Sequence, residues 1–276
     1  MTSTEDYLMA AAFVLIGGFT FFLGFIKMRK YRLIRDIPRS KIKSMAMGVI
    51  EIHGHVEADK LIKSPFSQTE CVYYKFEIKE YRQSSSSKKS GSTRKWEVVG
   101  SGDRSVPFIA KDETGTALVE PDKAEFVVTH KKVFYQKGQG FLASLKSIPR
   151  IVKALKTFNP NDTTSLLLEG DPLQPMEERK GLQVTNVGDR KYYEYYIEPG
   201  DGLFVLGTAA NSPDTPGNIV IKRGKNEKTF IISDKSEKAV LKNIKKTMLM
   251  CLIIGGIFLV TGVLLLFMAM GIVSGG

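Results

Sequence analysis

Two of the three histidines in the chain are spaced so that they could bind one metal ion. His53 and His55 are two residues apart in a segment of alternating apolar and polar residues, so a strand would place both imidazoles on one face. A zinc site needs three or four ligands, and Glu51 and Glu57 are the carboxylates nearby in the sequence. A solvent-facing strand surface carries such polar residues without any ion, and we favour that interpretation. The two histidines are weak metal candidates, and no metal or cofactor is expected.

Three other motifs have residue types that can do chemistry, but their contexts argue against it. Residues 138–143 match the G-x-G-x-x-A pattern of dinucleotide-binding loops, yet no βαβ unit surrounds them and no acidic residue follows at the required distance. Residues 112–115 lack the contiguous Asp-Thr-Gly of an aspartic protease and are typical of a turn. Cys71 opens an expected strand without an activating histidine, which indicates a structural thiol. The sequence therefore nominates no catalytic residue.

Both ends of the chain contain uncharged apolar segments that are long enough to cross a membrane. Residues 7–26 and 247–273 can each span the roughly 30 Å hydrocarbon layer as a helix. The first segment lacks the basic start and the small-residue cleavage site of a signal peptide, so we expect a retained anchor. The sequence therefore predicts two transmembrane helices.

The positive charges lie between these two segments. All 40 lysines and arginines fall between Lys27 and Lys246, whereas two of the 29 acids, Glu5 and Asp6, precede the first segment. Because basic flanking residues resist translocation, we expect the central domain in the cytoplasm and both termini outside. The same charge is expected to attract the domain to anionic lipid headgroups.

The central residues predict a mainly β domain. Alternation of apolar and polar side chains indicates strands over 46–56 and 71–81, and shorter apolar segments indicate further strands. Two pairs of neighbouring segments are expected to form hairpins, 126–129 with 133–136 and 218–222 with 228–232. The order of strands and turns suggests an OB-like small antiparallel barrel with a helical insertion, although another small antiparallel barrel also fits the pattern.

Two segments interrupt the expected strands. Residues 83–94 have no apolar side chain and cannot repay the entropy of ordering, so they predict a disordered loop. Residues 141–158 have apolar side chains at helical spacing and predict an amphipathic helix. Its apolar stripe fits the domain core, but its cations could instead contact the membrane surface. These cations are Lys146, Arg150, Lys153 and Lys156.

Several motifs follow one another in the order of a known family. They are GVIEIHGHVEA, SPFSQTECVYYKFEIKEY, then Trp96, then VPFIAKDETGTALVEPDKAEF and YYEYYIEPGDGLFVLGTA. With the two flanking apolar segments, this order resembles the GIDE family, also called the Beside-A-Membrane (BAM) domain. The resemblance covers residues 46–209 and both flanks. The motif residues, which we expect to be structural, are Gly48, Ser64, Pro65, Cys71, Tyr73, Asp112, Gly115, Pro199, Gly200 and Gly207.

The resemblance implies a relation to ubiquitin ligases, but the sequence departs from them at one point. In the mitochondrial and chloroplast ligases of this family, a RING follows the second membrane segment, and a RING holds two four-coordinate zinc ions with Cys and His ligands. This chain has only two cysteines and three histidines. We therefore expect a RING-less relative of the prokaryotic type, in a prokaryotic plasma membrane.

Three functions remain open at this point. We favour a membrane-anchored, non-catalytic binding or scaffolding protein that faces the cytoplasm and has an unknown protein partner. Family inheritance allows a ligase-type factor that needs a RING and a ubiquitin-conjugating enzyme from other chains. Nucleic-acid binding, which we consider unlikelier, would need basic and aromatic residues on one strand face. The candidate aromatic residues are Tyr192, Tyr193, Tyr195 and Tyr196.

The expected organisation follows the charge and hydropathy patterns. It consists of an external tail (1–6), a transmembrane helix (7–26), a basic juxtamembrane linker (27–45), the β-rich domain (46–232), a basic helix (233–246), a second transmembrane helix (247–273) and a short tail (274–276). The fold class is thus two transmembrane α-helices that flank a mainly β (α+β) cytoplasmic domain.

Overall fold

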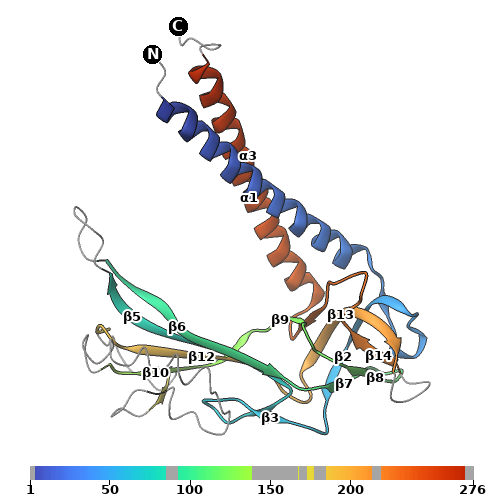
Figure 1. Ribbon diagram of the computed structural model, residues 1–276. Helices are drawn as coiled ribbons and strands as arrows, with labels where there is room; N and C mark the ends of the chain where they lie inside the picture. The colour runs from blue at the N-terminus through green and yellow to red at the C-terminus, as the bar shows by residue number, and fades with distance from the viewer. Residues whose placement is uncertain are drawn as a thin grey trace. The chain divides into compact units, whose positions relative to one another are not determined.

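The computed structural model describes residues 4–84, 93–138, 167, 173–176, 185–212 and 219–270. The chain divides into a helical unit, Met1–Arg39 with Lys235–Gly276, and a central domain, Ser40–Asp234 (Figure 1). The helices are α1 (Thr4–Asp36) and α3 (Glu237–Ala269), with a short 3-10 helix, η1 (Ile42–Ser44). The strands are β1 (Arg39–Ser40), β2 (Gly48–Glu57), β3 (Ile62–Lys63), β4 (Glu70–Cys71), β5 (Tyr73–Ser84), β6 (Thr93–Ser105), β7 (Phe108–Lys111), β8 (Thr116–Val119), β9 (Glu125–Val127), β10 (His130–Gln136), β11 (Gln174–Pro175), β12 (Arg190–Ile197), β13 (Gly202–Asn211), β14 (Ile219–Lys222) and β15 (Ile231–Ser233).

The two helices pack against each other in antiparallel orientation. At one end of the pair, the hydroxyl of Tyr7 donates a hydrogen bond to the carbonyl of Ala269 at 2.7 Å. Glycines bring the backbones close, because a Cβ on Gly17 would lie 2.7 Å from the backbone nitrogen of Leu259. A Cβ on Gly255 would likewise lie 2.5 Å from a backbone nitrogen of the opposite helix. Small residues of this kind are typical of helix contacts in membranes.

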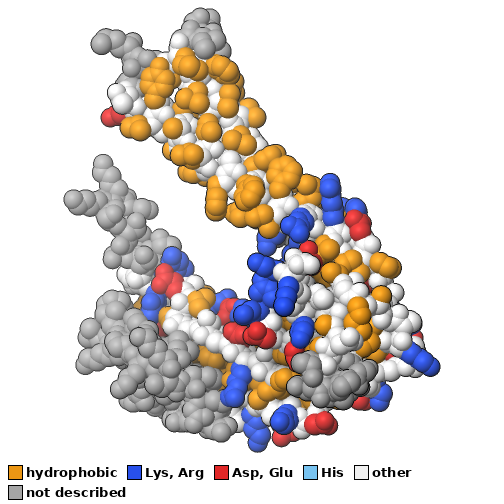
Figure 2. All heavy atoms as spheres, turned by 45° about the vertical axis from the view of Figure 1, so that its right-hand side comes forward, with side chains coloured by type: hydrophobic (Ala, Val, Ile, Leu, Met, Phe, Trp, Pro, Cys, Tyr) orange, Lys and Arg blue, Asp and Glu red, His pale blue; other side chains and the backbone are white. Residues whose placement is uncertain are grey.

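The surface of the helical unit is apolar along most of its length. Figure 2 shows hydrophobic side chains covering the visible face of both helices. Both α1 and α3 are long and apolar enough to cross a membrane. Large side chains such as Phe19 and Ile257 remain 66% and 59% exposed, and such a surface is unfavourable in water. These helices indicate a membrane protein, in agreement with the two predicted spans.

The core of the central domain is a closed five-stranded barrel. Its strands follow the order β2–β7–β8–β14–β13, and β13 returns to β2 through an eight-residue register from Gly48↔Ala209 to His55↔Gly202. All neighbours are antiparallel except β8 and β14. In chain order the barrel runs 1-2-3-5-4-1, which is the strand arrangement of an OB fold. The prediction of an OB-like barrel is confirmed, with one parallel pair among its antiparallel ones.

A second sheet is built from the chain inserted between barrel strands. Its order is β11–β10–β12–β5–β6, and it has a core of its own around Phe76, Ile78 and Tyr192. Three backbones meet where this sheet joins the barrel: Val72 donates to Ile197 at 2.9 Å and accepts from Val106 at 2.9 Å. The barrel core, by contrast, contains Ile52, Val205 and Ile232 among other residues.

Both predicted hairpins are wrong. The segment 126–129 lies mostly in β9, which pairs with β15, whereas β10 leaves the barrel and pairs with β11 and β12. Likewise, β14 pairs with β13 and β8, while β15 pairs with β13 and β9. Sequence neighbours were expected to pair because short connections favour hairpins. In the structure, these strands pair with partners that are not their neighbours in the sequence.

The predicted interruptions fall largely outside the described residues. The loop expected over 83–94 is shorter at both ends, because β5 continues to Ser84 and β6 begins at Thr93. The amphipathic helix expected over 141–158 lies outside the described residues altogether, and so do its four cations.

Candidate functional site

One face of the second sheet combines lysines with aromatic rings. Strands β5 and β12 pair so that Lys75 lies opposite Tyr195, Glu77 opposite Tyr193, and Lys79 opposite Lys191. Side chains that lie opposite each other share a face of an antiparallel sheet. We call this surface the lysine–tyrosine face and define it by Lys75, Lys79, Lys191, Tyr193 and Tyr195.

The ammonium groups of this face lie over aromatic rings. The Nζ of Lys79 is 4.7 Å from the ring centre of Tyr193, and the Nζ of Lys75 is 5.6 Å from that of Tyr195. The Nζ of Lys191 lies 4.5 Å from the ring of Trp96 in β6. Such cation–π contacts hold an ammonium group without neutralising its charge. The face is therefore a preorganised set of positive charges on rigid, flat side chains.

Two carboxylates partly balance these charges, because Asp103 of β6 lies opposite Lys75 and so shares this face with Glu77. Glu77 lies between the two lysines of β5, 3.1 Å from the Nζ of Lys75 and 3.8 Å from that of Lys79. Partial burial, with a smaller contribution from the charge of Glu77, raises the pKa of Tyr195, so its hydroxyl stays protonated at neutral pH. With three lysines and two carboxylates, the face keeps a net positive charge.

The opposite face of the same strands is buried. Tyr192 is fully buried and donates a hydrogen bond to Gln136 at 2.6 Å, and Tyr196 is also buried. Next to them, the guanidinium of Arg190 binds the carboxylate of Glu80 through Nε and Nη2, each at 2.9 Å. Of the four tyrosines singled out in the sequence, two are therefore core residues and two belong to the lysine–tyrosine face.

The Ser64-Pro65 motif forms a turn that packs on this buried face. The hydroxyl of Ser64 accepts the backbone N–H of Thr69 at 3.1 Å. The buried carboxylate of Glu194 accepts the backbone N–H groups of Phe66 and Ser67 at 2.6 and 3.1 Å. The ring of Phe66 then packs edge-on against Tyr192 at 4.9 Å. These contacts give the motif a structural role.

Cys71 follows this turn and is buried. Its Sγ lies 3.4 Å from the carbonyl oxygen of Ile62. Burial, with smaller contributions from the charges of Glu194 and Glu198, raises the pKa of the thiol to about 12. A thiol with such a pKa has almost no thiolate at neutral pH and is a poor nucleophile.

The motif residue Tyr73 stacks on Phe126, with 3.6 Å between ring centres.

The Asp112 turn connects the linker to the barrel. Its Oδ1 accepts the backbone N–H groups of Thr114 and Gly115 at 2.7 and 3.0 Å, and its Oδ2 accepts that of Ile42 at 2.9 Å. Desolvation raises the pKa of Asp112, but the hydrogen bond from the Thr114 hydroxyl and these three backbone hydrogen bonds together outweigh it, so the pKa lies below the ordinary 3.8. Residues 112–115 therefore form a turn. The carboxylate of Asp112 holds the backbone of this turn and that of Ile42 in place.

The remaining motif glycines have either a backbone conformation that favours glycine or close packing around the Cα. Gly48 and Gly200 have φ angles of 115° and 87°, which favour glycine. Gly200, after Pro199, donates its N–H to the carbonyl of Val56 at 2.8 Å. A Cβ on Gly207 would lie 2.9 Å from side-chain atoms of the barrel core.

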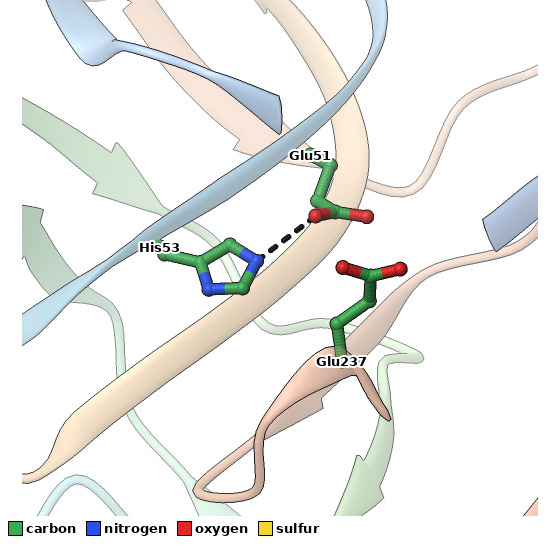
Figure 3. Close-up of side chains that lie close together, drawn as sticks. All are labelled: Glu51, His53 and Glu237. Atoms are coloured by element: carbon green, nitrogen blue, oxygen red, sulfur yellow. Dashed lines mark hydrogen bonds and ion pairs between the residues drawn. The ribbon is translucent and has the colours of Figure 1, made fainter. Parts of the chain in front are cut away.

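The weak metal candidates do not form a pair. His53 is hydrogen-bonded to Glu51, with 2.9 Å between Nε2 and Oε1 (Figure 3), and not to His55, which is exposed. The expectation that Glu51 faces solvent is wrong, because it is 1% exposed. On this face of β2, Glu51 is buried, His53 is half-buried and His55 is exposed.

Two open pockets lie in the central domain. One, of about 590 Å³, is lined by Ile42, Met45 and the β7–β8 turn. The other, of about 450 Å³, lies between Phe66, Phe134 and Lys131, whose Nζ is 2.9 Å from Asp201. Among the described residues that line them, neither pocket has a histidine, a cysteine or a carboxylate. The described walls therefore offer no acid–base pair for catalysis.

Sequence reasoning did not nominate the three lysines of the lysine–tyrosine face. The alternation of apolar and polar residues in β5 already placed Lys75 and Lys79 on the polar face of the strand, so their shared face could be predicted from the sequence. The pairing of β5 with β12, which brings both lysines to the tyrosines, joins residues more than a hundred positions apart. No local pattern specifies that pairing.

Comparison with known proteins gives one match. A family model described as GIDE, E3 ubiquitin ligase, matches residues 77–267, which is more than half of the chain. No curated protein and no solved structure matches the chain. The matched range begins in β5, includes the barrel strands β7, β8, β13 and β14, and ends within α3. The chain therefore belongs to the GIDE family of E3 ubiquitin ligase-related membrane proteins.

Proposed function

We propose that this protein is a membrane-anchored, non-catalytic binding module whose lysine–tyrosine face receives an acidic surface of a partner protein. The observation that carries the proposal is the arrangement of Lys75, Lys79 and Lys191 on aromatic rings around Glu77. Aromatic and basic side chains that are already held in place lose little entropy when a partner binds. An acidic partner would also be attracted by long-range electrostatics.

The proposal includes an orientation in the membrane. The basic residues of α1 and α3 lie at the same end of the antiparallel pair, opposite the end where Tyr7 meets Ala269. Basic residues near membrane segments favour the cytoplasmic side. This supports a cytoplasmic central domain and external termini, in a membrane that we expect to be a prokaryotic plasma membrane.

The binding role is tested with the full chain in lipid nanodiscs. Polyglutamate serves as the acidic probe, and its binding is measured at low and high salt. Charge reversal by Lys79→Glu together with Lys191→Glu should abolish the salt-sensitive binding. The charge-matched control is Lys123→Glu together with Lys60→Glu, because both lysines are exposed and lie outside the strands of the second sheet. Equal loss in both variants would show only a general charge effect and would contradict the proposal.

The same surface is then tested in native membranes. A photo-crosslinking amino acid at Tyr193 should capture a partner, and one at the exposed barrel residue Leu118 should not. The Lys79→Glu and Lys191→Glu changes should remove the Tyr193 product. A Tyr193 product that survives both reversals would contradict the role of the lysines.

The ligase alternative is tested separately. The chain has five cysteines and histidines in total, fewer than the eight ligands of two four-coordinate zinc sites. Purified protein should therefore not discharge ubiquitin from a charged ubiquitin-conjugating enzyme. Discharge by the chain alone would refute the non-catalytic role, and discharge only with an added RING protein would support the family-inherited alternative.

A second candidate function, single-stranded nucleic-acid binding, rests on one observation. Tyr193 and Tyr195 share a face with three lysines, as a stacking platform with a positive surface would require. Fluorescence anisotropy with a labelled single strand tests it. Binding that weakens steeply with salt and is lost in Tyr193→Ala would favour this function over an acidic protein partner.

A further inference from the structure

Strand β6 is an open edge of the second sheet. It runs from Thr93 to Ser105 and, within the described part of the chain, pairs only with β5 (Figure 1). The opposite edge, β11, has two residues and ends in Pro175, which has no N–H to donate. In the sheet that contains the barrel, the outermost strands among the described residues are β1 and β9, which have only two and three residues. A long edge presents free backbone donors and acceptors and is prone to pair with another strand.

The first half of β6 is accessible. Arg94, Lys95 and Val98 are exposed, and Val98 keeps 57% of its surface in contact with solvent. The register with β5 shifts after Val98, so that Val99 bulges between the two halves of the strand. A bulge ends regular pairing on an edge. The segment that can accept a further strand is therefore Thr93–Val98.

This segment is complementary to itself in antiparallel orientation. If two copies pair around a two-fold axis at Trp96, Lys95 of the first copy lies opposite Glu97 of the second. The symmetry also places Glu97 of the first copy opposite Lys95 of the second. Lys95 and Glu97 share one face of the sheet, since they lie opposite Arg82 and Glu80 on β5. Trp96 lies on the other face, opposite Tyr81. Two opposite-charge pairs thus flank a central tryptophan pair, which is the isologous contact that a symmetric dimer requires.

We propose that β6 pairs with β6 of a second copy of this chain, with Trp96 on the two-fold axis and two Lys95–Glu97 pairs beside it. The second sheets of both copies then form one continuous sheet. This interaction uses the edge of the sheet and goes beyond the proposed partner binding on its lysine–tyrosine face.

Charge exchange tests the register. Lys95→Glu places two glutamates opposite each other on both sides of the axis, and Glu97→Lys does the same with lysines. Each single change should weaken the dimer of the full, detergent-solubilised chain by about 10-fold to 100-fold. The combined Lys95→Glu, Glu97→Lys chain recreates opposite pairs and should regain the dimer. Mass photometry at several concentrations measures the dissociation constant.

Disulfide trapping tests the axis. In a Cys251→Ala background, Trp96→Cys places two cysteines directly opposite each other, at a separation that a disulfide can bridge. Val98→Cys is the matched control, because its two copies would be about 13 Å apart along the strands. The first variant should form a covalent dimer and the second should not.

Each alternative occupant gives a distinct result. A wild-type chain that stays monomeric overturns the proposal. A dimer that persists in both charge variants and gives no Trp96→Cys product lies elsewhere, for example between membrane helices, and also overturns it. Equal weakening in the singles and in the double exchange shows damage to β6 itself and no specific register, which again contradicts the proposal. Crosslinking of Trp96→Cys to a different protein in native membranes would show that another chain takes this edge.

Discussion

The carboxylate of Glu194 accepts a hydrogen bond from the backbone N–H of Phe66 at 2.6 Å, although 128 residues separate them. Glu194 is buried on the central strand of the second sheet and also accepts from Ser67. One charged side chain thereby fixes the turn that follows the Ser64-Pro65 motif. The ring of Phe66 is held against Phe76 at 5.6 Å as a result.

Removal of this carboxylate should loosen the turn. Because hydrogen bonds to charged groups contribute roughly 1.5–3 kcal/mol, we expect Glu194→Ala to lower the free energy of unfolding by about 2–3 kcal/mol. Glu194→Gln keeps one acceptor and should lose less. Denaturant unfolding of the full chain in detergent, followed by fluorescence of the single tryptophan, measures both values. Identical midpoints for wild type and Glu194→Ala would refute the anchoring role.

The buried ion pair between Glu80 and Arg190 should be far more sensitive than an exposed one. Glu80→Gln leaves the guanidinium of Arg190 in the core without its carboxylate and should cost roughly 3–5 kcal/mol. Glu57→Gln breaks the pair with Lys111, whose two side chains are 48% and 52% exposed, and should cost less than about 1 kcal/mol. The same unfolding experiment compares them. Similar losses would mean that burial does not govern the energetics of these pairs.

Acid should release the linker from the barrel through Asp112. Its pKa is lower in the folded protein, so the folded state binds fewer protons and the stabilisation is fully present above the ordinary pKa of 3.8. It is lost as the pH falls below that value through the lower folded pKa. Asp112→Asn should therefore destabilise the protein at about pH 7 and have little effect at about pH 2. Unfolding midpoints across this range, or hydrogen exchange of the Ile42 amide, test the prediction, and a pH-independent difference would contradict it.

The helix pair should discriminate between two adjacent glycines. A Cβ on Gly255 meets the backbone of Phe21 at 2.5 Å, whereas a Cβ on Gly256 meets nothing within 4 Å. Gly255→Ala should separate the helices at a cost of about 1–3 kcal/mol, and Gly256→Ala should be nearly neutral. The rate of disulfide formation between cysteines at Phe13 and Phe258, whose rings stack at 5.3 Å, reports the separation. If both alanine variants crosslink like the parent, the close contact is refuted.

Sequence patterns predicted those parts of the fold that depend on local periodicity. The strand over 46–56 appears as β2 (Gly48–Glu57), and the strand over 71–81 is contained in β4 and β5. The two apolar helices were equally clear, because a membrane segment needs only length and hydropathy. The OB-like barrel followed from the order of strands and turns and is confirmed.

Burial and contacts that depend on residues far away in the sequence could not be predicted from local sequence patterns. The polar appearance of Glu51 predicted exposure, but the side chain is buried. The carboxylate of Asp234 accepts the backbone N–H of Thr129, 105 residues earlier in the chain, at 3.1 Å. The lysine–tyrosine face depends on the same kind of contact, since β5 and β12 meet only after the chain has returned across the sheet.

The closing seam of the barrel has a consequence for biosynthesis. Gly48 pairs with Ala209, so the first barrel strand leaves the ribosome long before its partner exists. Contacts between residues so far apart form slowly, because a long loop must close first. During translation, the apolar face of β2 therefore stays unpaired and exposed until β13, the fourth barrel strand in chain order, has been synthesised. Co-translational folding of this protein should thus depend on chaperones that shield this strand, and pauses placed before residue 202 should increase its degradation.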